Sequence, residues 1–229
     1  MFKIKAVIFD LDGTLVKFTL DYKSLRREAI TALARHGAPS EILSVYEPIF
    51  KTLEKADLYF RNNGATEEKI HQAHDEVINL TEKYEMEAAL STDVMPGAEI
   101  TLRSLKEAGV KIGLCTNNGL KAVRFLMRKY RLRDYFDNIV TRESIPNMKP
   151  DTGHFLAAIA PLRVRPEETM MVGDSIIDIK TAKPLGATVV GIQSDHSPNV
   201  NLKDEGADYI IDSIVDVPEI LRALNAALN

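Results

Sequence analysis

Short apolar runs rich in valine and isoleucine recur along the chain, and most are continuous rather than alternating with polar residues. Each run is bounded by turn-forming or polar residues. A continuous apolar run of this length is typical of a strand that is buried on both faces, as in a parallel sheet. The pattern therefore predicts five or six strands, at Ile4–Phe9, Lys111–Cys115, Asn138–Thr141, Thr169–Gly173, Thr188–Ile192 and Asp208–Ile211.

Segments in which apolar residues recur with helical spacing separate most of these strands. They predict helices at Ala98–Ala108, Leu120–Tyr130, Asp151–Ala160, Ile176–Leu185 and Val217–Leu228. Alternating strands and helices are typical of a doubly wound sheet, because each helix carries the chain back to start the next parallel strand. We therefore expect an α/β fold with a Rossmann-like parallel sheet at its core.

One stretch breaks this alternation just after the first strand. Between about Lys17 and Thr92 no run is typical of a strand, and the helical patterns lie at Tyr22–His36, Ser40–Ala56 and Thr66–Glu87. The block predicts an all-α module inserted at the carboxyl end of the first strand, where ligands bind in open α/β sheets. The predicted domains are a core of residues 1–15 and 92–229 and a helical cap of residues 16–91.

Composition narrows the class of protein. The 229 residues carry a formal net charge of −4, so no basic field favours nucleic acid as a partner. The single cysteine, Cys115, excludes an intrachain disulfide and suits a reducing compartment. Charged residues interrupt the apolar stretches before they reach the length of a membrane span. We expect a cytoplasmic monomer or homodimer without membrane contact.

Acidic side chains follow two of the predicted strands. Asp10 and Asp12 end the first strand beside Gly13, and Asp174 and Asp178 follow the run that ends at Gly173. Taken singly, each pair has an ordinary explanation, because Asp-Gly is a common turn pair and aspartates stabilise helix N-termini. Four acids at one sheet edge would repel one another unless a cation neutralised them. Mg²⁺ prefers such a group of carboxylates, so the sequence predicts a magnesium site.

Two further motifs fit a phosphate site at the same edge. Thr116 and Asn117 follow the second strand and offer a hydroxyl and amide groups to phosphate oxygens. Lys149 stands just before a predicted helix and supplies a cation that balances the charge of a phosphate and of a nucleophile. Each signal is weak alone, since Thr116 could cap a helix and most lysines are solvated. Their order at strand ends makes the combination specific.

This ordered set resembles the haloacid dehalogenase superfamily, in its phosphatase branch. The matching motifs are Asp10-Leu11-Asp12-Gly13-Thr14, Thr116-Asn117, Lys149-Pro150 and Gly173-Asp174-Ser175-x-x-Asp178. The helical insertion resembles the four-helix cap of the phosphoglycolate phosphatase and β-phosphoglucomutase group. Three departures bear on the substrate. Residues 16–19, Val-Lys-Phe-Thr, differ from the acidic residue plus small polar residue common in that group. Asn118 stands where that group often has a lysine, and Thr152 replaces its usual second proline.

The resemblance implies a mechanism. Asp10 would attack phosphorus and form an aspartyl-phosphate, while Asp12 would protonate the leaving oxygen and then activate water. Thr116 would bind the phosphoryl group and Lys149 would orient Asp10. This assignment agrees with the physics of phosphoryl transfer, which needs positioning and charge neutralisation more than elaborate covalent chemistry.

The resemblance also implies a metal and a substrate site. Mg²⁺ would be held by Asp10, the backbone carbonyl of Asp12 and Asp174, with Asp178 supporting the metal shell. The expected substrate is a small phosphorylated metabolite, with phosphoglycolate or a sugar phosphate as first candidates. The residues expected to bind this substrate are Thr116, Asn117, Gly13 and Lys17.

Other functions remain open at this point. A phosphomutase of the β-phosphoglucomutase type could use the same scaffold and return the phosphate to the sugar. A dehalogenase is disfavoured by Asp12, and a non-catalytic binding module is disfavoured because every expected catalytic position is filled. His71 and His74, spaced like metal ligands, are better explained as the polar face of an exposed helix.

Overall fold

The computed structural model describes residues 2–17, 20–193 and 201–227. The chain divides into two compact units, each described here by itself. The core unit consists of Met1–Phe18 and Thr92–Asn229, and the helical unit consists of Thr19–Ser91.

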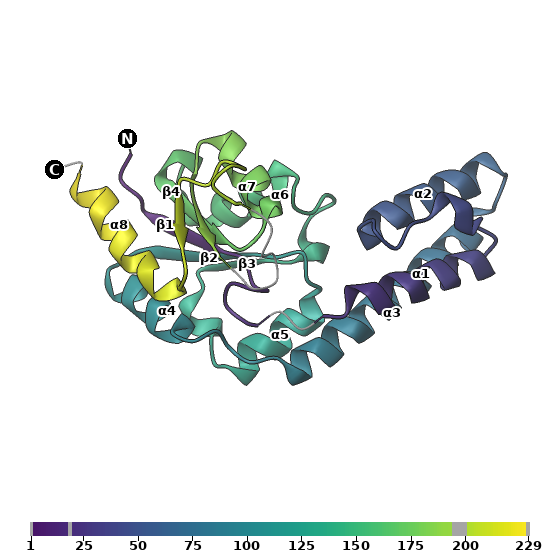
Figure 1. Ribbon diagram of the computed structural model, residues 1–229, viewed down its shortest axis with the longest axis horizontal. Coiled ribbons are helices and arrows are strands. Elements are labelled where there is room, and N and C mark those ends of the chain that lie inside the picture. Colours follow the sequence, from purple (N-terminus) through teal and green to yellow (C-terminus); the bar gives the residue numbers. More distant parts are fainter. Residues whose placement is uncertain (1, 18–19, 194–200, 228–229) are drawn as a thin grey trace. The chain divides into compact units, whose positions relative to one another are not determined.

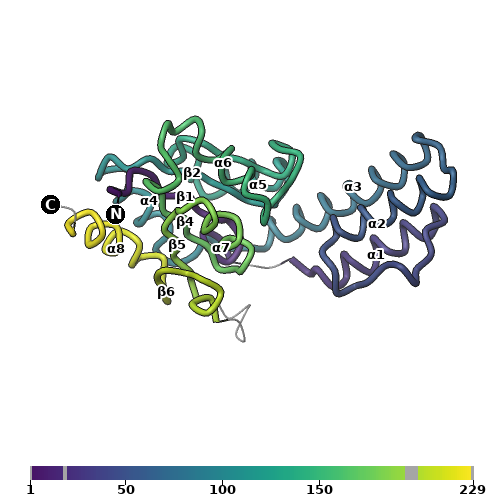
Figure 2. Tube along the Cα trace, turned by 90° about the horizontal axis from the view of Figure 1, so that it is seen from above, coloured from purple at the N-terminus to yellow at the C-terminus, as the bar shows by residue number. Residues whose placement is uncertain are grey.

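The core unit contains a six-stranded sheet in the order β3-β2-β1-β4-β5-β6, with every neighbouring pair parallel. Figure 2 shows β6, β5, β4, β1 and β2 following one another across the sheet. This arrangement confirms the predicted α/β fold with a Rossmann-like sheet. The strands are β1 (Ala6–Phe9), β2 (Lys111–Cys115), β3 (Asn138–Val140), β4 (Thr169–Gly173), β5 (Thr188–Ile192) and β6 (Tyr209–Ile211).

Helices cover both faces of the sheet, which explains the continuous apolar runs. They are α4 (Ala98–Glu107), α5 (Leu120–Lys129), α6 (Thr152–Ile159), α7 (Ile176–Ala182) and α8 (Val217–Ala226). The pair α6 and α7 packs on one face, and α4 and α8 pack together on the other (Figure 1). Ile8 of β1 belongs to the cluster that contains Phe155 and Ile179 of the first pair. All four residues of β1 are buried, so the first strand is central to the core.

Element boundaries differ from the predicted ones where a local cap ends the regular structure. The strand predicted to reach Thr141 ends at Val140, because Thr141 caps a 3₁₀ turn through its hydroxyl and the Ser144 hydroxyl. The helix predicted from Asp151 begins at Thr152, because the Asp151 side chain accepts the N–H of Gly153 and acts as the N-cap.

The helical unit contains α1 (Tyr22–Arg35), α2 (Ile49–Asn62) and α3 (Glu67–Ser91). The helix predicted at Ser40–Ala56 is wrong: Ser40–Ile42 form a 3₁₀ turn, and α2 begins only after Pro48. A proline disfavours helical conformation in the residue before it and is well tolerated next to the helix start, so Pro48 moves the start. Between α1 and α3, the Tyr84 hydroxyl donates to Glu28 at 2.6 Å.

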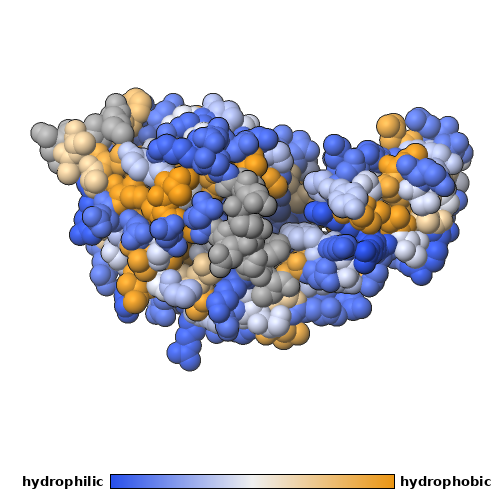
Figure 3. All heavy atoms as spheres, viewed as in Figure 1, coloured by the Kyte–Doolittle hydropathy of each residue, from blue (hydrophilic) through white to orange (hydrophobic). Residues whose placement is uncertain are grey.

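The surface is largely hydrophilic in the view of Figure 3, with several apolar patches, one of them beside α8. None of the helices in the described ranges has the length and apolar content that a membrane crossing requires.

Candidate active site

The register of the central strands brings the predicted site residues to one edge of the sheet. Phe9 of β1 pairs with Leu114 of β2 and with Val172 of β4, so Asp10, Thr116 and Asp174 follow three adjacent strands at nearly the same level. The N–H of Asp10 continues the ladder by donating to the carbonyl of Val172 at 2.9 Å. Parallel pairing therefore brings three motifs that are far apart in sequence together at one edge of the sheet.

Three carboxylates form a buried cluster at this edge. Oxygen atoms of Asp10, Asp174 and Asp178 all lie within 4.8 Å of one another. The three residues are 8%, 9% and 1% exposed, so water does little to screen their repulsion. Burial raises the pKa of Asp10 well above its ordinary value, the carboxylates of Asp178 and Asp174 raise it further, and the ammonium of Lys149 opposes both effects. A hard divalent cation fits this donor set, because it removes the repulsion that burial strengthens.

Two glycines allow the carboxylates to pack against the backbone. Gly13 has a φ of +73°, and a Cβ atom there would lie 2.0 Å from Oδ2 of Asp174. At Gly173, a Cβ atom would lie 2.3 Å from Oδ2 of Asp178. Any other residue at either position would displace a carboxylate of the cluster. Gly13, predicted to bind substrate, is thus the residue on which Asp174 rests.

Asp178 is held by protein donors at both oxygens. Its Oδ2 accepts from the hydroxyl of Ser175 at 2.8 Å and from the N–H of Ser175 at 3.2 Å, which forms a capping box at the start of α7. Its Oδ1 accepts from Nζ of Lys149 at 2.6 Å. The contact with Lys149 was not predicted from the sequence.

Lys149 joins two members of the acidic cluster. Its buried Nζ donates to Oδ1 of Asp10 at 2.7 Å as well as to Asp178. Burial alone would lower the pKa of Lys149, but the carboxylates of Asp10 and Asp178 outweigh that effect and raise it. Lys149 is therefore held in its protonated, positively charged form. Because it binds Oδ1 of Asp10, Oδ2 is the oxygen of Asp10 that does not face the lysine.

The residues after β2 contact both sides of this arrangement. Asn117 binds the backbone of Lys149 through both ends of its side-chain amide. Asn118 donates from Nδ2 to Oδ2 of Asp12 at 2.9 Å, and its own N–H donates to the hydroxyl oxygen of Thr116 at 3.1 Å. Thr116 is 2% exposed. The binding of a substrate by Thr116 and Asn117 stays a prediction.

Lys17 lies apart from the buried group. Its Nζ is 3.7 Å from Oδ2 of Asp93, and both side chains are mostly exposed. The predicted contact of Lys17 with a substrate stays a prediction.

His154 is a residue of the site that sequence reasoning missed. It is fully buried in α6, and its Nδ1 accepts the backbone N–H of Lys149 at 3.0 Å. Burial, together with the ammonium of Lys149, lowers the pKa of His154 to about 4, so the ring is neutral at physiological pH. Its place five residues after the motif lysine was a signal, but one histidine on an apolar helix face did not indicate a function.

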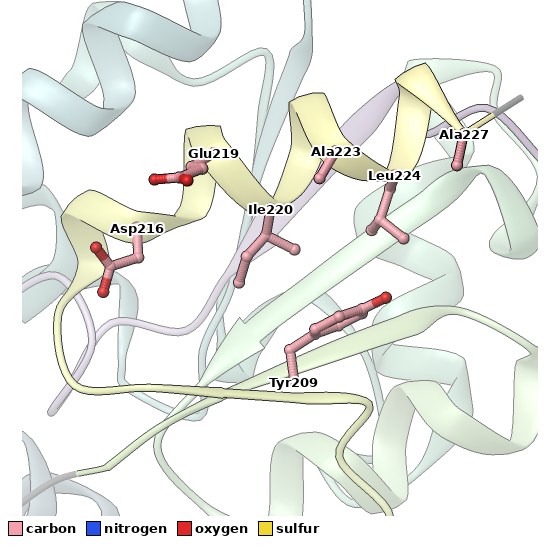
Figure 4. Close-up of a pocket in the computed structure, with 7 residues that line it drawn as sticks. All are labelled: Tyr209, Asp216, Glu219, Ile220, Ala223, Leu224 and Ala227. Carbon is pink, nitrogen blue, oxygen red and sulfur yellow. The ribbon is translucent and has the colours of Figure 1, made fainter. Parts of the chain in front are cut away.

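Other candidate features lie outside this edge. His71 and His74 do not belong to the acidic cluster and lie on α3. Burial raises the pKa of Cys115 to about 12, so its thiol stays protonated and unreactive. A groove of about 430 Å³ between α8 and β6 is lined by apolar side chains, with Asp216 and Glu219 at one end (Figure 4). It contains none of the three carboxylates of the acidic cluster.

Known proteins are similar in sequence to this chain over almost its whole length. A family model described as haloacid dehalogenase-like hydrolase matches residues 4–186. A phosphoglycolate phosphatase of Cereibacter sphaeroides is 32% identical over 225 residues, which are 96% of this chain and 99% of the relative. Pyrophosphatase PpaX of Bacillus mycoides is 28% identical over 232 residues, which are 97% of this chain and 99% of the relative.

A solved structure also shares the fold. The crystal structure of CbbY from Rhodobacter sphaeroides in complex with phosphate has a TM-score of 0.64 at 21% identity, covering 93% of this chain and 96% of that chain. At this level of identity, the likeness concerns the fold alone.

Proposed function

We propose that this chain, which belongs to the haloacid dehalogenase-like hydrolase family and is a phosphatase, hydrolyses a small phosphorylated metabolite through an aspartyl-phosphate on Asp10. The observation that carries the proposal is the position of Asp10. Its carboxylate accepts a hydrogen bond from the buried ammonium of Lys149 and has an oxygen within 4.8 Å of oxygens of Asp174 and Asp178. A carboxylate held through Oδ1 has its Oδ2 oriented for attack, while the surrounding donor set suits a cation that attracts a phosphoryl group.

In the first step, Oδ2 of Asp10 attacks phosphorus while Lys149 holds Oδ1. The bond between phosphorus and the leaving oxygen breaks, and that oxygen takes a proton from the carboxylic acid of Asp12. The products are the free alcohol and an aspartyl-phosphate on Asp10. Thr116 and the backbone N–H of Asn117 would bind the oxygens of the transferred group.

In the second step, a water molecule attacks the same phosphorus. The carboxylate of Asp12 takes the proton that the water loses, and the bond between Asp10 and phosphorus breaks. Inorganic phosphate leaves, and Asp10 and Asp12 return to their starting protonation states. One carboxyl group thus acts first as an acid and then as a base.

The acidic cluster fits Mg²⁺, which would be held by Asp10, Asp174 and the backbone carbonyl of Asp12, with Asp178 supporting the shell. When bound, the ion supplies positive charge where the carboxylates and the phosphoryl group meet. Asp178 orients Lys149 through Oδ1 and is itself held by Ser175.

We propose phosphoglycolate as the first candidate substrate, because a relative with 32% identity over nearly its whole length carries that name. Pyrophosphate is the second candidate, supported by the relative named as a pyrophosphatase. We further propose that residues 16–91 act as a cap that excludes water and selects the substrate. The extent of this proposed cap follows from the all-helical pattern after the first strand.

The test is phosphate release from phosphoglycolate, pyrophosphate and glucose phosphates, measured with Mg²⁺ and with a chelator in its place. We expect turnover only with the metal, and we expect Asp10→Asn to lose turnover on every substrate. Full turnover of Asp10→Asn would exclude the nucleophile assignment. For the glucose phosphates, isomer formation in place of phosphate release would identify a phosphomutase instead.

A further inference from the structure

We propose that Asn118 is a positioning residue of the reaction, which holds the carboxyl group of Asp12 in the orientation that protonates the leaving oxygen. This inference rests on the proposed function, because it needs Asp12 to be the acid. It goes beyond the motif assignments, which give Asn118 no role.

The contact is a hydrogen bond between two side chains that are distant in sequence. Nδ2 of Asn118 donates to Oδ2 of Asp12 at 2.9 Å. Asn118 is 8% exposed, so water competes little for its amide. The amide faces the carboxyl group with its nitrogen, and an N–H can donate both to an ionised carboxylate and to the carbonyl oxygen of the protonated acid.

The backbone of Asp12 is fixed, but its side chain needs an external partner to fix its orientation. The N–H groups of Leu15 and Val16 both donate to the carbonyl of Leu11, at 2.8 and 3.0 Å, and the N–H of Gly13 donates to the carbonyl of Val16 at 2.8 Å. This turn holds the Cα of Asp12 in place. Rotation about the side-chain bonds still decides where the carboxyl oxygens lie, and the amide of Asn118 restricts that rotation.

Asn118 itself is anchored on rigid elements. Its N–H donates to the hydroxyl oxygen of Thr116 at the end of β2, at 3.1 Å. Its carbonyl accepts the N–H of Arg142, in the turn that follows β3, also at 3.1 Å. The donor is thus carried by the ends of two neighbouring strands, and a group held in this way positions its partner with little entropy left to lose.

The direction of the hydrogen bond determines which oxygen of Asp12 carries the proton. An N–H donor stabilises the oxygen that keeps its full lone pairs, so Oδ2 acts as the carbonyl oxygen of the acid. The proton then resides on Oδ1, the oxygen that donates it to the leaving group in the proposed first step. The hydrogen bond therefore orients the acid as well as restraining it.

The test compares two substrates whose leaving groups differ in their need for an acid. Nitrophenolate is a stable anion that leaves without protonation, whereas an alkoxide does not. We therefore measure kcat/KM of the full chain with Mg²⁺ on p-nitrophenyl phosphate and on the best alkyl phosphate of the panel. This parameter reports only the steps up to loss of the leaving group, so hydrolysis of the aspartyl-phosphate does not affect it.

The variant Asn118→Leu removes the donor at similar side-chain size. We expect kcat/KM to fall about 10-fold or more on the alkyl phosphate, a part of what a whole general acid contributes. On p-nitrophenyl phosphate we expect a fall of less than about 3-fold, since that reaction needs no acid. Asn118→Ala removes the donor without adding a charge beside Asp12, and it gives the same test if Asn118→Leu does not fold.

The matched control is Asn138→Ala. The amide of Asn138 donates to the carbonyls of Ala157 and Ala158 at 3.1 and 3.0 Å, at the opposite end of β3 from the site. Asn138→Ala therefore loses hydrogen bonds comparable to that of Asn118, and we expect this variant to keep the wild-type kcat/KM on both substrates.

Asp12→Asn, measured in the same assay, separates the acid role of Asp12 from the positioning role of Asn118. If Asp12→Asn shows the leaving-group dependence and the Asn118 variants do not, the positioning role is excluded and the proposed function stands. If Asp12→Asn also lacks the dependence, Asp12 is not the acid and the proposed function fails in that respect. Equal losses on both substrates in the Asn118 variants would likewise overturn the positioning role.

Discussion

The side-chain amide of Asn117 binds both backbone groups of Lys149: Oδ1 accepts the N–H at 3.0 Å, and Nδ2 donates to the carbonyl at 3.0 Å. The same N–H is shared with Nδ1 of His154 at 3.0 Å. A buried lysine with four rotatable side-chain bonds reaches two carboxylates at fixed distances only if its backbone is fixed as well. Asn117 thus sets the point from which the ammonium approaches Asp10.

We expect Asn117→Ala to lower kcat/KM by a similar factor, about 10-fold, on alkyl and nitrophenyl phosphates, because displacement of Lys149 affects the attack of Asp10 whichever group leaves. Steady-state kinetics with Mg²⁺ on both substrates measures the factor. This uniform loss contrasts with the selective loss expected for the Asn118 variants.

The control for Asn117 is Asn225→Ala. The amide of Asn225 binds both backbone groups of Ile4 in the same way, at 2.8 and 3.1 Å, at the start of the chain. Both variants should lose about 1–3 kcal/mol of unfolding free energy. If Asn225→Ala lost as much kcat/KM as Asn117→Ala, the effect would be one of stability alone.

The buried ion pairs of Lys149 predict a large stability effect. Lys149→Met leaves Asp10 and Asp178 without their cation in a buried site, so the free energy of unfolding should fall by about 3–5 kcal/mol. Urea denaturation in the absence of Mg²⁺ measures it. Lys5→Met is the control, because Lys5 is also 2.6 Å from a carboxylate, that of Glu168, but its side chain is 55% exposed. We expect a loss of about 1 kcal/mol or less there, and equal losses would contradict the buried pairing.

His154 predicts a pH dependence of stability. Its pKa is lowered from 6.5 to about 4, so the folded chain keeps the ring neutral in a range where the unfolded chain binds a proton. As the pH falls from 6.5 toward 4, protonation of His154 therefore favours the unfolded state. The free energy of unfolding of the wild type falls by up to roughly 3 kcal/mol through this group. Below the lower pKa the contribution no longer changes.

The difference between the wild type and His154→Gln isolates this contribution, because the carboxylates titrate in both proteins. We expect the unfolding free energies of the two proteins to approach each other between pH 6.5 and 4, as measured by denaturant titration at fixed pH values. His71→Gln, in an exposed position on α3, is the control and should run parallel to the wild type. A constant gap for His154→Gln would show that the buried ring is not the source.

The sequence was sufficient for the fold and for the edge at which the site lies. Continuous apolar runs identified every strand of the sheet, because burial on both faces leaves no polar positions. Asp10, Thr116 and Asp174 directly follow such runs, so parallel pairing alone predicted that they meet. Pro48 was equally visible, yet the pattern of apolar residues before it was typical of a helix and outweighed it in the prediction.

The contacts between side chains could not be predicted in this way. Asn118 and Asp12 are 106 positions apart, and their hydrogen bond depends on how the turn after β2 lies against the turn after β1. The sequence indicates only that His154 lies in a helix, and its hydrogen bond with the backbone of Lys149 is visible only in the structure. Rotamers and loop paths follow from tertiary packing, whereas sequence periodicity reports only which face is buried.

Gly13 offers the sharpest test of the acidic cluster, because the chain contains a glycine with the same backbone and none of the surroundings. Gly13 and Gly109 have φ values of +73° and +72°, but a Cβ at Gly13 would lie 2.0 Å from Oδ2 of Asp174, whereas a Cβ at Gly109 meets nothing within 4 Å. Alanine at either position should cost about 1–2 kcal/mol of stability through the left-handed backbone. Only Gly13→Ala must also displace Asp174.

We therefore expect Gly13→Ala to need at least about 10-fold more Mg²⁺ for half-maximal thermal stabilisation, a signal that requires no turnover. Gly109→Ala should have a lower melting temperature than the wild type, but the same Mg²⁺ concentration should give half-maximal stabilisation. If both variants responded to Mg²⁺ like the wild type, Asp174 would not be a ligand, because its displacement would leave the ion unaffected.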